Sequence, residues 1–295
     1  MTEKQQQKIH FVTGKGGVGK SFFAASFAES LSRAYKMRQQ GNDSPILLAE
    51  INDVSFYKDY LSVNDISYQP VKTASFDLAQ WRAQDCLKEY ALHLLKLESL
   101  FKLFFENPIS KALIDVSPGL NELAILGKAT SHPRHHGPAL DYSQIVFDAP
   151  STGHFLTMFR SPKALSQTIQ FGPMGEQSRS IDEWIRNSNF VEIHLVTLAE
   201  ELPITETIEL YRSLKSEFSL TAKVYINKFI DINLGELKKE STEIQNYFYD
   251  IDQRQKSAML HLENAGINFN KIPFIFETEA KKLIAEAAQS MPSLT

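Results

Sequence analysis

Cysteine is almost absent from the sequence, with Cys86 the single one among 295 residues. One thiol cannot form an internal disulfide, and it cannot build a cysteine cluster for zinc or arsenite within one chain. This composition is typical of proteins from a reducing compartment. We therefore expect a cytoplasmic protein.

Positive charge is not in excess either, because 31 Lys and Arg stand against 35 Asp and Glu, for a formal net charge of -4. A broad nucleic-acid-binding face needs clustered basic residues to neutralise phosphates. The composition therefore predicts no nucleic acid partner. A small local basic patch stays compatible with this charge.

Long apolar runs are missing as well. The most apolar region, residues 90–105, is interrupted by His93, Lys96, Glu98 and Lys102, whereas a membrane-spanning helix needs about 18 or more apolar residues. The first residues lack the basic start and apolar core of a secretory signal. We expect no direct membrane insertion, although 43% hydrophobic residues suffice for a sizeable core.

Short runs of β-branched and aromatic residues recur along the chain, and helix-length segments separate most of them. Strands that are apolar on both faces and joined by helices are typical of a parallel sheet covered on both sides. We predict an α/β, doubly wound, mostly parallel sheet. Helices are expected at residues 20–37, 204–214 and 278–287. The expected strands are residues 9–13, 46–50, 75–80, 145–148, 191–197, 224–227 and 272–276.

No linker rich in Gly, Ser or Pro divides the chain. We therefore predict that residues 1–295 form a single domain. About 95 residues separate the second and the next long strand, far more than one crossover needs. Helical patterns in this interval and after the following strand predict helical insertions at about residues 82–130 and 161–188.

A phosphate-binding pattern, G-x-x-x-x-G-K-S/T, follows the first expected strand directly and precedes a helix. Glycines let successive backbone N–H groups surround phosphate oxygens, Lys20 would neutralise the β- and γ-phosphates, and Ser21 would ligate Mg²⁺. The pattern predicts binding of ATP or ADP with Mg²⁺. The predicted loop consists of Gly14, Lys15, Gly16, Gly17, Val18, Gly19, Lys20 and Ser21.

The second lysine of this loop, Lys15, makes it resemble the deviant phosphate loop of the dimeric ATPases. Residues 148–154, Asp-Ala-Pro-Ser-Thr-Gly-His, resemble the matching segment of the arsenical-pump and tail-anchored-protein targeting branch, and residues 118–123 and 196–207 add further matches. The sequence is identified as a bacterial member of that branch. The resemblance implies that Lys15 reaches the nucleotide of a partner subunit, so that ATP closes a homodimer; a solvated lysine is the alternative.

Two residues of the segment 148–154 have expected roles. Asp148, at the end of a strand beside the phosphate loop, can hold the water shell of Mg²⁺, and Gly153 can bring a backbone N–H close to a γ-phosphate. His154 lies in the same segment, where packing and catalysis are both open roles.

Base recognition is expected at Asn227, which ends a strand and precedes Lys228. A guanine-binding protein would carry Asp three residues later, but position 230 is Ile, which favours adenine. The resemblance implies that Asn227 contacts adenine and that a segment around Pro273 covers the base. A structural cap at the end of the strand is the alternative role for Asn227.

The sequence departs from the branch after the second strand, where the hydrolytic members carry Asp-Pro-Ala-His. Here Glu50 is followed by Ile51, Asn52 and Asp53, and the water-orienting position depends on where the strand ends. Asp53 is the best candidate, which makes Lys15, Lys20 and Asp53 the expected catalytic residues. If Asp53 faces away, hydrolysis should be slow, because water orientation supplies much of the rate.

Two further patterns have alternative readings. His132, His135 and His136 could hold a metal, but Pro and Gly beside them favour a flexible linker between the insertion and the next strand. An apolar stripe at residues 94–105 is best explained by core packing, although it could also line a groove for a client.

These observations together predict a Mg²⁺-dependent, ATP-hydrolysing homodimer whose nucleotide state gates binding of a protein client or a membrane partner. A nucleotide-gated scaffold or chaperone with negligible turnover is the alternative. A positioning ATPase like the partition proteins is less favoured, because a basic patch and a terminal amphipathic anchor are missing.

Overall fold

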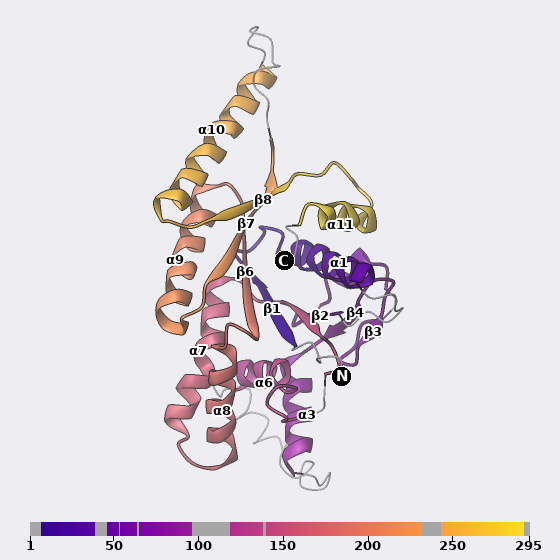
Figure 1. Cartoon of the computed structure of the whole chain (residues 1–295), viewed down its shortest axis with the longest axis vertical. Helices are drawn as coiled ribbons and strands as arrows, with labels where there is room; N and C mark the ends of the chain where they lie inside the picture. The colour runs from indigo at the N-terminus through magenta and orange to yellow at the C-terminus, as the bar shows by residue number, and fades with distance from the viewer. Residues whose placement is uncertain are drawn as a thin grey trace.

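The computed structural model describes residues 7–38, 46–52, 54–63, 65–95, 119–137, 140–231 and 243–291. Its centre is an eight-stranded sheet in the order β3-β4-β2-β5-β1-β6-β7-β8. All neighbouring strands are parallel except β3 and β4. The predicted α/β fold with a mostly parallel sheet is therefore confirmed (Figure 1).

Most of the expected strands are present, but two ends of the sheet differ from the prediction. The strand expected at residues 272–276 begins earlier and ends at Pro273, because residues 269–271 pair with β7 at the edge of the sheet without forming an apolar run. The two-residue strand β3 was not predicted. The strands are β1 Lys8–Thr13, β2 Ile46–Glu50, β3 Val71–Lys72, β4 Asp77–Gln80, β5 Gln144–Asp148, β6 Val191–Thr197, β7 Ala222–Phe229 and β8 Phe269–Pro273.

Helices cover both faces of the sheet, because alternate strand residues point to opposite sides. In β5, Ile145 and Phe147 join a core beneath α6, α7, α8, α9 and α10, whereas Val146 joins a second core beneath α1 and α11. The helices are α1 Lys20–Arg38, α2 Tyr57–Tyr60, α3 Ala83–Leu95, α6 Leu120–Ala129, α7 Thr152–Thr168, α8 Gly172–Ile185, α9 Glu201–Phe218, α10 Glu243–Asn264 and α11 Ala280–Gln289.

The helices α3, α6 and α8 gather beyond one end of the sheet, at the bottom of Figure 1. The helical stretch predicted from residue 161 is two helices, and the first, α7, already begins at Thr152. Residues 96–118 and the side chain of Leu94 lie outside the described residues, and with them the apolar stripe that could line a client groove. The division into one domain with two insertions stays a prediction.

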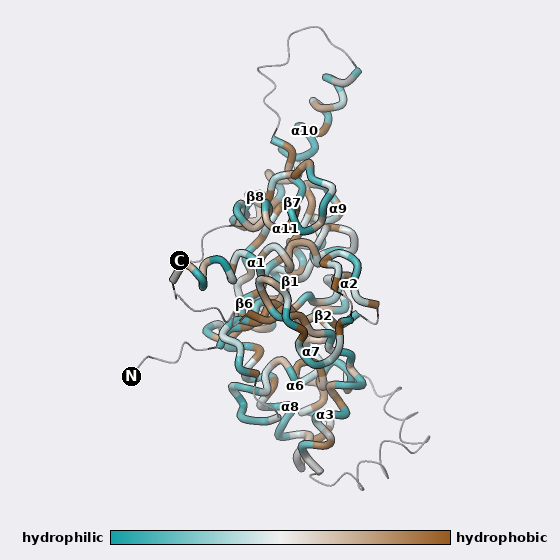
Figure 2. The backbone as a smooth tube through the Cα atoms, turned by 90° about the vertical axis from the view of Figure 1, so that its right-hand side faces the viewer, coloured by the Kyte–Doolittle hydropathy of each residue, from teal (hydrophilic) through white to brown (hydrophobic). Residues whose placement is uncertain are grey.

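Apolar residues concentrate in the central strands, as the brown tube segments of Figure 2 show, while the outer helices mix both colours. Within the part of the chain that the structure describes, no helix is long and apolar enough to cross a membrane.

Candidate functional site

The phosphate loop joins the end of β1 to the start of α1, as predicted. Two of its glycines are required by close contacts. Gly14 has φ +153°, and a Cβ there would lie 2.0 Å from the carbonyl oxygen of Val196; Gly19 has φ +89°, and its Cβ would lie 2.5 Å from Asn227 Nδ2. Any side chain at either position would collide with β6 or β7, so the loop conformation depends on glycine.

A Cβ on Gly16 or Gly17 would meet no atom of the described residues within 4 Å, so these residues leave the opposite side of the loop open. Lys20 Nζ donates to the carbonyl oxygen of Lys15, 3.2 Å away, and thus lies across the loop. Burial lowers the pKa of Lys20, while the charge of Asp148 opposes that shift. An anion bound in the loop would restore a strong partner for this partly buried ammonium.

Asp148 lies at the end of β5 and is 3% exposed. The Tyr57 hydroxyl lies 2.9 Å from Asp148 Oδ2, to which it donates, and 3.1 Å from the carbonyl oxygen of Ser21. Burial raises the pKa of Asp148, and hydrogen bonds from Ser21 and Tyr57 oppose the rise. The structure therefore brings the two predicted metal residues together. The sequence alone did not indicate Tyr57, which is fully buried.

A second carboxylate, missed in the sequence, lies beside Asp148. Glu50 ends β2, faces Asp148 in the strand register and is fully buried. Its Oε2 accepts from the backbone N–H of Phe56 at 3.1 Å, but its buried Oε1 has no hydrogen-bond partner among the described residues. Burial raises the pKa of Glu50. An unpaired buried oxygen on the strand neighbour of Asp148, the residue that Ser21 contacts, fits a hydrated divalent cation, so these residues suit Mg²⁺.

The position directly after β2 is occupied by Ile51, because the strand ends at Glu50. The backbone oxygen of Asn52 accepts a hydrogen bond from Gln80 Nε2 at 2.5 Å. Asp53 lies outside the described residues. Its role in orienting the attacking water therefore stays a prediction.

The segment after Asp148 is tied to β1 and then begins a helix. Thr13 Oγ1 donates to the carbonyl oxygen of Pro150 at 2.6 Å, and α7 starts two residues later. Gly153 lies in the first turn of α7, where a Cβ would meet no atom within 4 Å in the part of the chain that the structure describes. The His154 side chain is 59% exposed, and its Nε2 lies 3.3 Å from Glu122 Oε1 on α6. This contact connects the start of α7 with α6.

Lys15 is held by its own chain. Its Nζ lies 2.6 Å from Glu206 Oε1 on α9, and Thr152 Oγ1 donates to Glu206 Oε2 at 3.1 Å. The hydrogen bond from Lys15 lowers the pKa of Glu206. Glu206 was not singled out in the sequence, although it lies in the segment 196–207 that carried the resemblance. One carboxylate thus joins the phosphate loop to the start of α7.

Asn227 is 2% exposed and contacts the phosphate loop directly. Its Nδ2 donates to the carbonyl oxygen of Val18 at 2.9 Å, which secures the loop against β7. Pro273 ends β8, and the aromatic rings of Phe274 and Phe276 follow, 41% and 92% exposed, with ring centres 4.8 Å apart. Contact of Asn227 or Pro273 with adenine stays a prediction.

Residues 7–174 match the family model described as anion-transporting ATPase, which is more than half of the chain. The chain belongs to the anion-transporting ATPase family. The resemblance inferred from the phosphate loop and from residues 148–154 is therefore confirmed.

This member of the anion-transporting ATPase family is similar to three proteins from distant organisms. It is 28% identical over 237 residues to ATPase BagA of Mycobacterium tuberculosis, which covers 77% of this chain and 66% of BagA. It is 24% identical over 328 residues to the ATPase ASNA1 homolog of Plasmodium falciparum, and this match covers 96% of this chain and 80% of the homolog. It is 23% identical over 312 residues to ATPase GET3C of Arabidopsis thaliana, covering 83% and 74%.

A cavity of about 650 Å³ lies beside the site in this family member, where β2 and β5 end and where α3, α6 and α7 begin. His154 and Glu122, which contact each other, line this cavity together with Pro150 from the segment that follows Asp148. A change at the start of α7 would therefore alter this cavity. Residues that line it include Ile51, Arg82, Asn121, Glu122, Pro150 and His154.

Among the residues that the structure describes, the ligand atoms of His132, His135 and His136 do not converge on one point as a metal site requires. His136 Nε2 lies 2.6 Å from Gln177 Nε2, and its ring packs against His93 at 5.5 Å between centres. His135 has φ +52°, which places it in a turn. These contacts place the histidines in a turn that packs against neighbouring helices, where the sequence favoured a flexible linker.

Proposed function

We propose that the protein hydrolyses ATP with Mg²⁺ as a homodimer whose nucleotide state gates the binding of a protein client or a membrane partner. The observation that carries the proposal is the convergence of Lys20, Ser21 and Asp148 at one phosphate loop, with an unpaired Glu50 oxygen beside them. Membership of an ATPase family supports the same reaction.

The chain supplies the groups that phosphoryl transfer requires. Backbone N–H groups of the loop and Lys20 would hold the phosphates, while Ser21 and Asp148 would hold the metal directly or through water. Bound Mg²⁺ would supply charge neutralisation at the phosphate oxygens. Ile230 lacks the carboxylate that binds the guanine amino group, so ATP should displace bound ADP better than GTP does.

The contact of Lys15 with Glu206 suggests how nucleotide could close a dimer. Phosphates of a partner subunit would compete with Glu206 for the Lys15 ammonium. If Lys15 leaves, Glu206 would still accept the hydrogen bond from Thr152 at the start of α7. That helix contacts α6 through His154 and Glu122, so closure would reach the helices beyond the end of the sheet.

A scaffold that binds nucleotide with negligible turnover is the second candidate. The observation in its favour is Ile51, an apolar residue directly after β2 where the related hydrolytic proteins carry an aspartate. Under this reading the same loop binds ATP, and Asp53 does not orient water.

Phosphate release by the purified protein distinguishes the two candidates. Lys20→Ala and Asp53→Ala should both reduce turnover, and wild-type turnover equal to that of Lys20→Ala would refute the proposal that the protein hydrolyses ATP.

Sedimentation with a non-hydrolysable ATP analogue tests the proposed dimer. Lys15→Ala should keep nucleotide binding, which Lys20 and the backbone hold, yet lose closure; unchanged closure would refute a role across the interface.

A further inference from the structure

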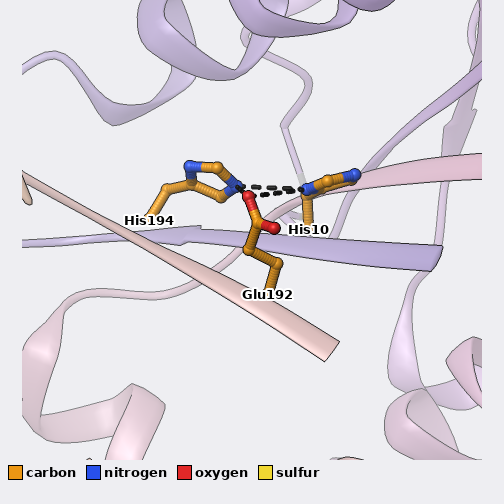
Figure 3. A group of neighbouring side chains, drawn as sticks. All are labelled: His10, Glu192 and His194. Carbon is orange, nitrogen blue, oxygen red and sulfur yellow. Dashed lines mark hydrogen bonds and ion pairs between the residues drawn. The ribbon is translucent and has the colours of Figure 1, made fainter. Parts of the chain in front are cut away.

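Three polar side chains form a buried cluster that the nucleotide site does not use. His10 on β1 and His194 on β6 are 2% and 0% exposed, and Glu192 on β6 reaches the same place (Figure 3). The ring of Phe27 on α1 lies over both histidines, at 5.1 Å and 4.5 Å between centres. At about 3.3 Å per strand residue, His10 lies roughly 13 Å before Gly14, well away from the phosphate loop.

The three side chains direct one ligand atom each toward a common point. His10 Nδ1 lies 3.1 Å from His194 Nε2, His194 Nε2 lies 3.2 Å from Glu192 Oε1, and His10 Nδ1 lies 3.7 Å from Glu192 Oε1. Tetrahedral zinc with bonds of about 2.0–2.1 Å places its ligand atoms about 3.3 Å apart. The triangle therefore has the size of one face of a zinc coordination sphere.

Each histidine has a polar partner for its outer nitrogen. His10 Nε2 lies 2.8 Å from Gln144 Oε1, an acceptor, so in the neutral ring Nε2 carries the hydrogen and Nδ1 offers its lone pair to the cluster. Without a metal, His194 Nε2 donates to this Nδ1; when an ion binds, the hydrogen of the His194 ring would move to His194 Nδ1, from which the Tyr225 hydroxyl can accept it. His194 Nδ1 lies 3.2 Å from the Tyr225 hydroxyl. Such outer partners fix the ring and its tautomer in most histidine metal sites.

The charged neighbours give the cluster access to solvent. Lys8 Nζ lies 2.9 Å from Glu192 Oε2, and Lys223 Nζ lies 2.8 Å from Glu192 Oε1, the oxygen that faces the histidines. The side chains of Lys8 and Lys223 are 33% and 51% exposed, whereas that of Glu192 is 13% exposed. A divalent cation would replace Lys223 on this oxygen. The Lys223 side chain would then rotate so that its ammonium group is hydrated by solvent, which avoids a desolvation penalty.

We propose that His10 Nδ1, Glu192 Oε1 and His194 Nε2 bind a zinc ion, with a fourth position left for water. Two imidazoles and one carboxylate form a ligand set that zinc accepts. The ion would cross-link β1, which leads into the phosphate loop, with β6, which leads toward α9 and Glu206.

Zinc binding by the metal-free protein tests the proposal. The protein is treated with EDTA, dialysed, and titrated with ZnCl₂ in excess MgCl₂ and without nucleotide. We expect one saturable site per chain and a melting temperature higher by about 4 °C at a hundredfold excess over Kd. Cobalt should give the intense visible absorption of a tetrahedral site, a readout from the wild-type protein alone. Absence of saturable zinc binding by the folded wild type would overturn the proposal.

Variants assign the binding to the cluster. Glu192→Gln and His194→Gln should each abolish the zinc-dependent rise in melting temperature, while Asp148→Asn should keep it, because that variant alters only the nucleotide site. A triple alanine variant of the histidines at residues 132–136 should also keep it. Loss in the triple variant with retention in Glu192→Gln would assign zinc to the surface turn and overturn the proposal. The partly exposed Glu192 position keeps the test valid if His194→Gln does not fold.

Discussion

Replacing Tyr57 by phenylalanine removes one hydroxyl group from the centre of the predicted nucleotide site. The ring is fully buried, so phenylalanine keeps the packing. The lost contact is the hydrogen bond of 2.9 Å to Asp148 Oδ2. Hydrogen bonds to charged groups contribute about 1.5–3 kcal/mol, and we expect Tyr57→Phe to lower the free energy of unfolding by that amount at neutral pH.

The expected change in melting temperature follows from the size of the chain. Unfolding entropy of about 2.1 cal/mol/K per residue gives about 0.6 kcal/mol/K for 295 residues. The melting temperature should therefore fall by about 2–5 °C. Differential scanning fluorimetry or calorimetry without nucleotide measures this shift. Tyr60→Phe is the matched control, because the Tyr60 hydroxyl in the same helix has no hydrogen bond among the described residues, and its ring packs on Phe56 at 4.7 Å.

The difference in melting temperature between the wild type and Tyr57→Phe should also depend on pH. The bond from Tyr57 opposes the rise in the pKa of Asp148 that burial causes. Its strongest contribution therefore belongs to the ionised carboxylate, and it is lost as the pH falls through the folded-state pKa of Asp148. The gap between wild type and Tyr57→Phe should narrow in acid. Equal melting temperatures of Tyr57→Phe, Tyr60→Phe and wild type at neutral pH would refute the reasoning.

Three further variants probe the same site. Because burial raises the pKa of Asp148, Asp148→Asn should raise the melting temperature of the nucleotide-free protein at neutral pH, yet abolish the stabilisation by Mg²⁺ and ATP that thermal melts detect in the wild type. Glu50→Gln should lower kcat by about 10- to 100-fold, and an unchanged kcat in phosphate-release assays would remove Glu50 from the site. Glu206→Gln should release Lys15 from its ion pair. Because exposed ion pairs contribute about 1 kcal/mol or less, the concentration of ATP analogue that closes the dimer in sedimentation should fall by a factor of about two to five.

The parts of the site that the sequence could predict are local in the chain. The phosphate loop lies between a strand and a helix within a few residues, so its spacing alone indicates its geometry. Asp148 was predicted because it ends an apolar strand and begins the segment 148–154 that carries the resemblance. Glu50 also ends an apolar strand, β2, but no motif of the family marks its position.

The contacts that were missed join residues far apart in the chain. Tyr57 and Asp148 are 91 residues apart, Lys15 and Glu206 are 191 apart, and His10 and His194 are 184 apart. No sequence period relates such residues, because their contact depends on strand order and helix placement. A polar residue at alternate positions of a buried strand, as at His10 and His194, is the one signal that could have drawn attention to the buried cluster.

Nucleotide-driven changes should be concentrated in the helices and not in the sheet. Strands β1, β5 and β6 are buried on both faces, and close packing of that kind resists displacement. The Lys15 and Glu206 side chains are instead 28% and 30% exposed, so their ion pair costs little to exchange for another partner. Glu206 also holds Thr152, and α7 continues through His154 to Glu122 on α6. These partly exposed contacts thus lead from the phosphate loop to the helices and the cavity, which is the route that the proposed gating of a partner would use.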